Sequence, residues 1–182
     1  MKYLATFLVL QFLVLNTLFA QNGDTKKSNL ENNKTFFAEV GGAGILFSAN
    51  YDQRFTKSRL GLGYRVGLGF TLVDKANYTG TYYNYRTSTV GTIPLGLSYI
   101  FGKNNNPNTF EVGAGTTILT SKASVLNYNE YRESNILGNF TFMYRRQPID
   151  GGFAWRVGFT PIINNDGDIF PFVGLGLGYS FK

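Results

Sequence analysis

The stretch Pro171-Phe-Val-Gly-Leu-Gly-Leu-Gly-Tyr-Ser-Phe-Lys182 alternates large apolar side chains with residues no larger than serine. The large members are Val173, Leu175, Leu177, Tyr179 and Phe181. A repeat of two residues predicts a β-strand with one apolar face and one nearly bare face. An apolar face that ends in Tyr and Phe suits a strand that meets lipid, with its rings at the membrane interface. The stretch therefore predicts the closing strand of a small membrane barrel.

The start of the chain indicates export. Met1–Lys2 is a short positive start, Tyr3–Leu15 is a nearly unbroken apolar run, and Asn16–Ala20 fits a cleavage region. This pattern predicts a signal peptide over residues 1–20, because the run is shorter than the ~20 residues that a spanning helix needs. The polar residues 21–34 predict a flexible periplasmic lead-in, and residues 35–182 a single barrel domain.

Composition agrees with a barrel. No later stretch approaches ~18 consecutive apolar residues, so a mature protein in a membrane would have to be a closed barrel. The sequence holds 22 glycines, 17 phenylalanines and 12 tyrosines, residues that favour sheets when they alternate. The net charge is +6, but the basic residues are scattered and accompany no nucleic-acid-binding motif. We therefore expect no nucleic-acid partner.

Period-two patterns predict eight strands along the chain. They cover residues 36–44, 45–55, 59–71, 89–101, 109–120, 135–145, 153–160 and 171–181. A single kinked strand over residues 36–55 is the alternative, but a barrel with both ends in the periplasm needs an even number of strands. Pro94 predicts a bulge or local break in its strand.

The connections between these strands alternate in length. The polar segments 74–88 and 121–134 are long and 164–168 is shorter, whereas the turns at the other end are compact. Bacterial outer-membrane barrels have long outer loops and short periplasmic turns. The aromatic residues predicted near the short turns form a candidate interface girdle. They are Phe55, Tyr99, Phe101, Phe110, Tyr144, Phe153, Trp155, Tyr179 and Phe181.

Several glycine-rich strand segments support a family resemblance. They are Glu39–Gly44, Ser48–Phe55, Arg65–Gly69, Ile93–Gly102 and Phe110–Gly115. In these segments the chain resembles the small outer-membrane β-barrel proteins of Bacteroidetes-type bacteria, eight-stranded barrels of the OmpA/OmpX kind. The resemblance implies an all-β, antiparallel, up-and-down transmembrane barrel after a cleaved signal peptide. It also implies a Gram-negative outer membrane, outer-membrane lipid as surroundings, and delivery by the barrel insertion machinery.

The faces opposite the apolar ones carry charges. They hold the carboxylates Glu39, Asp52 and Glu111 and the guanidinium groups of Arg54, Arg65, Arg145 and Arg156. An eight-stranded barrel has an interior just wide enough for side chains, so these groups should pair across it. Arginine suits this place because its planar fork binds carboxylates at two points. The sequence predicts an ion-pair plug, with a proton or anion path as the alternative.

Catalysis finds little support. The chain contains no histidine and no cysteine, which removes Ser-His-Asp arrangements, imidazole and thiolate metal sites, disulfides and a lipidated cysteine. The mid-strand glycines form no phosphate-binding motif. Asp166–Asp168 lacks the ligand series of a calcium loop and is interpreted as a turn. We expect no enzyme activity, no cofactor and no metal.

The two long connections carry tyrosine and arginine. The residues are Tyr78, Tyr82, Tyr83, Tyr85 and Arg86 in one, and Tyr128, Tyr131 and Arg132 in the next. Tyrosine with arginine is typical of recognition surfaces, although tyrosines near a membrane rim also serve as anchors. The hypothesis is an extracellular recognition site for a ligand or protein that the sequence does not identify.

Three functions are compatible with these patterns. The first is an outer-membrane barrel with a charge-plugged lumen and a structural or interaction role through its loops, for example as an accessory of an envelope complex. The second is a narrow passive conduit for small or apolar solutes. The third is a soluble periplasmic lipid binder of the lipocalin kind, with the apolar faces turned inward.

Overall fold

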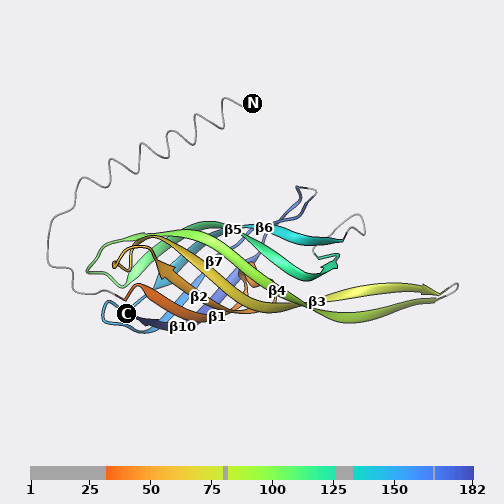
Figure 1. The fold of residues 1–182 in the computed structure, drawn as a ribbon, viewed down its shortest axis with the longest axis horizontal. Helices are drawn as coiled ribbons and strands as arrows, with labels where there is room; N and C mark the ends of the chain where they lie inside the picture. The colour runs from red at the N-terminus through yellow and green to blue at the C-terminus, as the bar shows by residue number, and fades with distance from the viewer. Residues whose placement is uncertain (1–31, 80–81, 126–132, 166) are drawn as a thin grey trace, which may run out of the picture.

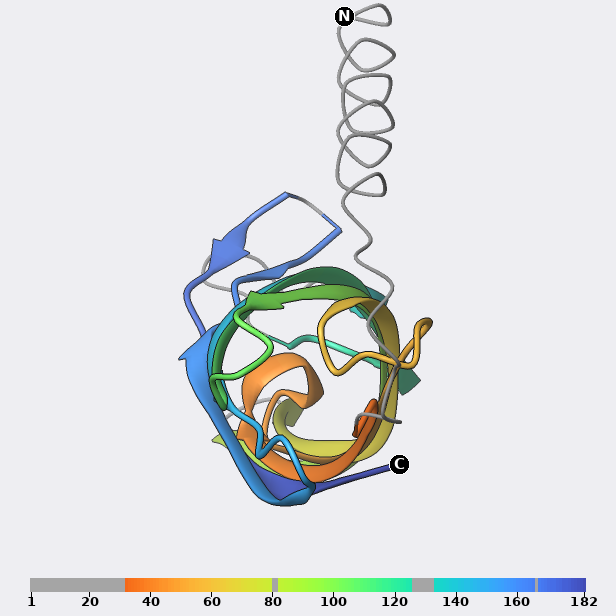
Figure 2. The ribbon, with the colours of Figure 1, turned by 90° about the vertical axis from the view of Figure 1, so that its left-hand side faces the viewer.

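The strands form one closed antiparallel sheet. The computed structural model describes residues 32–79, 82–125, 133–165 and 167–182. The elements are β1 Lys34–Gly41, the 3-10 turn η1 Gly42–Gly44, β2 Phe47–Arg54, β3 Gly61–Thr79, β4 Tyr82–Gly102, β5 Asn108–Ala123, β6 Ser134–Arg146, β7 Gly152–Phe159, β8 Ile162–Ile163, β9 Ile169–Phe170 and β10 Val173–Phe181. Because β1 pairs with both β2 and β10, the sheet closes into the ring that Figure 2 shows end-on.

Two of the barrel strands are interrupted by proline. β8 pairs with β6 in the same register as β7 does, and β9 continues the register of β10 in the same way. In this register Pro161 lies opposite Pro171, and neither has an N–H to donate, so the ladder breaks there. Counted as continuous strands, β7–β8 and β9–β10 complete a barrel of eight. The closing strand resumes regular pairing at Val173, two residues after its predicted start.

The first hairpin settles the choice between two strands and one. β1 and β2 pair from Lys34 opposite Gln53 to Val40 opposite Phe47, which confirms two strands. The chain reverses through Gly41 and Gly42, whose φ angles are 71° and 66°. This backbone region is open to glycine and costly for other residues.

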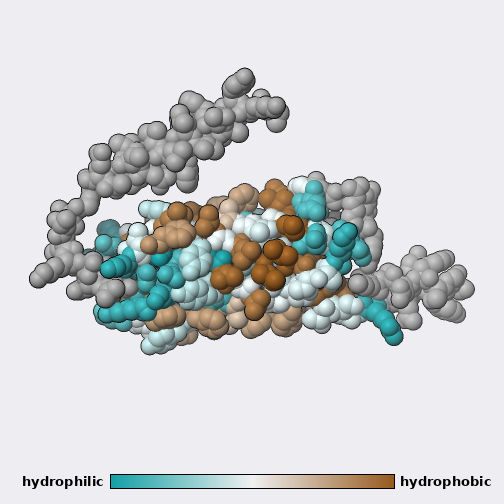
Figure 3. Space-filling view, viewed as in Figure 1, coloured by the Kyte–Doolittle hydropathy of each residue, from teal (hydrophilic) through white to brown (hydrophobic). Residues whose placement is uncertain are grey.

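Alternation places the apolar faces outside. On β10, Val173, Leu175, Leu177 and Tyr179 are between 50% and 66% exposed, whereas the small residues between them face inward. Brown apolar residues accordingly occupy the middle of the barrel surface in Figure 3. This arrangement is the reverse of a lipocalin, in which the apolar faces line the interior, so that interpretation is wrong. Across the described ranges, no helix has the length and apolarity to cross a membrane.

The prediction of a loop over residues 74–88 is wrong. β3 and β4 stay paired from Gly69 opposite Thr92 to Thr79 opposite Tyr82. β2 stops pairing with β3 at Phe70, and β5 stops pairing with β4 at Thr92. Residues 71–79 and 82–91 therefore form a two-stranded arm, here called the β3–β4 arm, that extends beyond the barrel (Figure 1). Polar composition suggested a loop, but Thr, Tyr and Val favour strands, and a hairpin outside the barrel needs no apolar face.

Pro94 interrupts one of its two ladders. The pairs Val66–Leu95 and Gly69–Thr92 keep one register, with no pairing between them. On the other side Pro94 lies opposite Thr117 in an unbroken ladder with β5. The missing N–H therefore produces the predicted local break without a bulge.

Candidate functional site: the filled lumen

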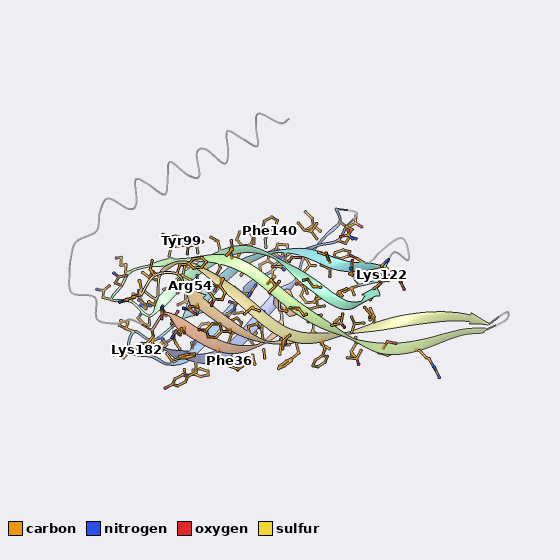
Figure 4. The ribbon with its side chains drawn as sticks, in the orientation of Figure 1. Phe36, Arg54, Tyr99, Lys122, Phe140 and Lys182 are labelled. Carbon is orange, nitrogen blue, oxygen red and sulfur yellow. The ribbon has the colours of Figure 1, made fainter. Side chains whose placement is uncertain are left out.

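The seven charged residues predicted for the lumen come together inside the barrel. They lie on β1 (Glu39), β2 (Asp52, Arg54), β3 (Arg65), β5 (Glu111), β6 (Arg145) and β7 (Arg156), and none is more than 5% exposed. The period of two decides this, because each residue alternates with an outward apolar or aromatic neighbour. Figure 4 labels Arg54 among the side chains of the barrel.

The first part of the network joins β2 to β6. The Arg54 Nη2 atom lies 2.6 Å from Oδ1 of Asp52, and Arg54 also donates to the Ser98 carbonyl at 2.8 Å. The other Asp52 oxygen lies 3.1 Å from Nη1 of Arg145. Arg145 in turn donates to the Thr35 hydroxyl at 2.7 Å. Asp52 therefore lies between two arginines and links strands on different sides of the barrel.

The network continues from Arg145 to Arg65. Nη1 of Arg145 lies 3.2 Å from Glu111, whose two oxygens also accept from Arg156 at 3.0 and 3.1 Å. Arg156 reaches Glu39 through Nε at 3.2 Å and Nη2 at 2.9 Å. Glu39 is then 3.8 Å from Nη1 of Arg65. The last contact is the longest in the series.

The seven groups form a strictly alternating chain. Its order is Arg54, Asp52, Arg145, Glu111, Arg156, Glu39, Arg65, so each carboxylate lies between two arginines. Four guanidinium groups against three carboxylates leave one net positive charge. Removing charges from water is costly, and mutual pairing offsets that cost only when the geometry is good. Such a chain links six strands of the barrel electrostatically.

The short-turn end holds a fifth buried arginine that the predicted set did not include. Arg59 is fully buried and donates to the carbonyls of Gln147, Lys103, Asn104 and Asn106 over 2.5 to 3.3 Å. These carbonyls belong to the β4–β5 and β6–β7 turns. Because Arg59 itself lies in the β2–β3 turn, its side chain connects three turns. The alternation placed Arg59 on the inward face, but nothing in the sequence revealed carbonyls as its partners.

The chain just before β1 is fastened at the same end. Gln147 donates from Nε2 to the Asn32 carbonyl and to the Ser180 hydroxyl, both at 2.7 Å. Asn32 donates to the Ile149 carbonyl at 2.7 Å. The first and last strands are therefore held together by side chains as well as by their ladder.

The other end of the lumen is closed by the β1–β2 connection. η1 turns inward, as the orange segment inside the ring in Figure 2 shows, and its carbonyls accept from the barrel wall. The Thr117 hydroxyl donates to Ala43 at 2.6 Å, and the Thr92 hydroxyl donates to Gly44 at 3.1 Å. A buried apolar cluster surrounds this turn. Its members are Ile45, Val73, Val90, Leu119, Ala123, Val125, Leu137 and Ile162.

The void that the described residues leave beside the charged chain is small. A void beside Thr35, Phe37, Arg145 and Arg156 has a volume of about 10 Å³. That is close to the minimum for a single water molecule. The charged side chains therefore fill the lumen around this void.

The first group of predicted recognition residues lies in the β3–β4 arm. Tyr78 lies on β3, and Tyr82, Tyr83, Tyr85 and Arg86 lie on β4, so they belong to the β3–β4 arm and not to a loop. The register sets Tyr78 opposite Tyr83, and the Arg86 side chain is exposed. The second group, Tyr128, Tyr131 and Arg132, falls outside the described residues. Within the described part of the chain, no cluster of three or more acidic side chains could hold a metal ion.

Closed antiparallel strands, apolar outer faces and a polar filling are the features of outer-membrane barrels. The chain is similar to the N-terminal β-barrel domain of Pseudomonas aeruginosa OprF, at 14% identity and a TM-score of 0.54, over 83% of this chain and 99% of that one. It is also similar to the Yersinia pestis outer-membrane protein Ail, solved in a phospholipid bilayer nanodisc, at 12% identity and a TM-score of 0.50 with the same coverage. No protein-family model and no curated protein matches the chain. The chain therefore has the eight-stranded fold of outer-membrane barrels.

Proposed function

We propose that the protein is an integral outer-membrane barrel with a closed lumen, and that it acts as a structural or interaction protein through its arm end. The observation that carries the proposal is the seven-membered ion-pair chain below the inward-folded η1. A barrel so filled has only its outer surface and its rims with which to act. The motifs shared with small barrels of Bacteroidetes-type bacteria, and the predicted signal peptide, support export to a Gram-negative outer membrane by the barrel insertion machinery.

The outward faces support the membrane assignment. β10 presents nine residues, which matches the 9–11 residues that a tilted strand needs to cross the hydrocarbon layer. Its outward side chains are apolar or aromatic throughout. Release of the folded protein as a soluble periplasmic species on cell fractionation would contradict this part of the proposal.

Conductance tests whether the lumen is closed. The refolded protein in planar bilayers should give no steady current, and its vesicles should not swell in small sugars. A matched variant, Arg156→Ala, removes the residue that bonds two of the three carboxylates and should raise the frequency of brief openings. A large steady conductance of the unaltered protein would replace the plug with the conduit.

The arm tests the interaction role. Residues 74–87 can be replaced by Asn-Gly, because Val73 lies opposite Ser88 and a two-residue turn of this type joins antiparallel strands. A companion variant keeps the arm but changes Tyr78, Tyr82, Tyr83, Tyr85 and Arg86 to serine. Cells that display the protein should bind immobilised envelope glycans or surface proteins more weakly with either variant. Unchanged binding by two folded variants would remove the arm from the proposal.

A further inference from the structure

Cations surround the short-turn end of the barrel, and all of those named below except the half-buried Lys34 are exposed. Every connection and both strand ends at this rim supply one. They are Lys34 at the start of β1, Lys57 between β2 and β3, Lys103 between β4 and β5, Arg146 at the end of β6, and Lys182 after β10. This set is called the basic rim. In the described ranges none of its members forms an ion pair with an acidic side chain, and Asp150 is the one acidic side chain in the short turns.

Two members of the basic rim lie on the outward faces of their strands. Lys34 alternates with the buried Thr35, and Arg146 alternates with the buried Arg145. The register sets Lys34 opposite Phe181 and Arg146 opposite Trp155. A cation beside an outward aromatic ring is the arrangement found where a membrane protein crosses from hydrocarbon to headgroups.

Aromatic rings form two rows directly inside the basic rim. Phe101, Phe110, Tyr144 and Trp155 contact one another in order across β4 to β7, with ring centroids 5.5 to 6.0 Å apart. A second row joins Phe55, Tyr64, Tyr51 and Phe181, with centroids 5.8 to 6.5 Å apart. Since such rings sit at headgroup level, the cations just beyond them reach the phosphates.

The opposite end shows no such bias among the side chains that the structure describes. There the exposed charged side chains are Arg86 and Lys122 against Glu133 and Asp168, two of each sign. Teal residues lie at both ends of the molecule in Figure 3, so both ends are polar. Among the described side chains, the excess of cations lies at the short-turn end.

We propose that the basic rim binds the phosphates of anionic phospholipid headgroups in the leaflet next to the short turns. The inference rests on the proposed membrane function. Cations held at fixed places around the circumference recruit anionic lipids one contact at a time, and each contact is favoured about fivefold over a zwitterionic lipid. The barrel then carries an annulus enriched in anionic lipid on one side.

Lipid selection in nanodiscs tests the proposal. The protein is assembled with equal amounts of phosphatidylcholine and phosphatidylglycerol. Detergent then removes part of the lipid, and mass spectrometry measures which lipids stay bound to the protein. Phosphatidylglycerol should be enriched several-fold, and the enrichment should fall as salt rises. The variant K57Q/K103Q/R146Q/K182Q should lose it, whereas R86Q/K122Q, which neutralises cations at the opposite end, should keep it.

Three outcomes would count against the inference. Equal retention of both lipids by a protein that has inserted, shown by heat-modifiable migration on a gel, would overturn it and leave the membrane assignment intact. Failure of the unaltered protein to insert would instead overturn the proposed function. Inorganic phosphate is added in place of chloride at equal ionic strength. If phosphate alone displaced the bound lipid, the rim would be a site for free anions and not for headgroups.

Discussion

The two halves of the lumen are filled by opposite chemistry. The half toward the short turns holds the alternating chain of seven charges, and the half toward the arm holds η1 within an apolar cluster. Apolar filling depends on volume, because each methylene lost leaves a cavity. Ionic filling depends on completeness, because removing one partner leaves another charge buried and alone. The same barrel wall should therefore respond to substitutions by different rules at its two ends.

The largest effect is expected in the middle of the charged half. Arg156→Met removes the guanidinium group that pairs with both Glu39 and Glu111. Among the described ion pairs, Glu39 then keeps the 3.8 Å contact to Arg65. The same guanidinium group lies 4.4 Å from the Phe37 ring centroid. The free energy of unfolding should fall by about 3–5 kcal/mol, measured by urea titration of the barrel in vesicles. A loss below about 1 kcal/mol would mean that solvation by water, and not pairing with Arg156, stabilises these carboxylates.

A pair of glycines tests the η1 turn, which lies against Glu39 of the charged chain. Gly42 and Gly167 both have positive φ, at 66° and 88°, but a methyl group at Gly42 would lie 2.6 Å from the Glu39 carboxyl carbon and one at Gly167 would meet nothing. Glu39 cannot yield freely because Arg156 holds it at 2.9 Å. Gly42→Ala should therefore cost about 1–3 kcal/mol more than Gly167→Ala in the same titration. Equal costs would mean that backbone strain alone matters and that η1 can move.

A smaller effect is expected in the apolar half. Ile162 is 1% exposed and belongs to the cluster around η1. Ile162→Val removes one methylene and should cost about 0.5–1.5 kcal/mol, by transfer and cavity terms together. Ile169→Val on the paired strand is the control, because Ile169 is 64% exposed and loses little buried area. Similar costs at both positions would mean that the apolar end is loosely packed.

Sequence reasoning reached the barrel and its charged filling because both depend on alternation. The inward position of Glu39, Asp52, Arg54, Arg65, Glu111, Arg145 and Arg156 follows from period two, which is why the structure brings all seven together. The sequence could not predict which of these residues pair with one another, because the pairing depends on strand register and on side-chain rotamers across the lumen. The inward direction of η1 could not be predicted either, because a glycine-rich turn has the same sequence pattern whether it points into the lumen or out of it.

The β3–β4 arm and the proline break between β7–β8 and β9–β10 could not be predicted for a different reason. Residues 74–88 were assigned to a loop because they lack an apolar face, yet a hairpin beyond the barrel needs none. The opposition of Pro161 and Pro171 depends on the pairing of β7 with β10, a long-range fact that neither proline signals alone.

The smallest effect is expected at the end of the charged chain, where it separates pairing from mere burial. Arg65 contributes only the 3.8 Å contact to Glu39 and a 3.3 Å hydrogen bond to the Thr141 hydroxyl. Arg65→Met would leave three guanidinium groups against three carboxylates, with Asp52, Glu111 and Glu39 each still within 3.2 Å of an arginine. The unfolding free energy should change by less than about 1 kcal/mol, because replacing a poorly paired buried charge by an apolar group is often neutral. Arg156→Met is the matched substitution, with the same residue types in the same lumen. Equal losses for the two would show that the network responds to total charge and not to its alternating order.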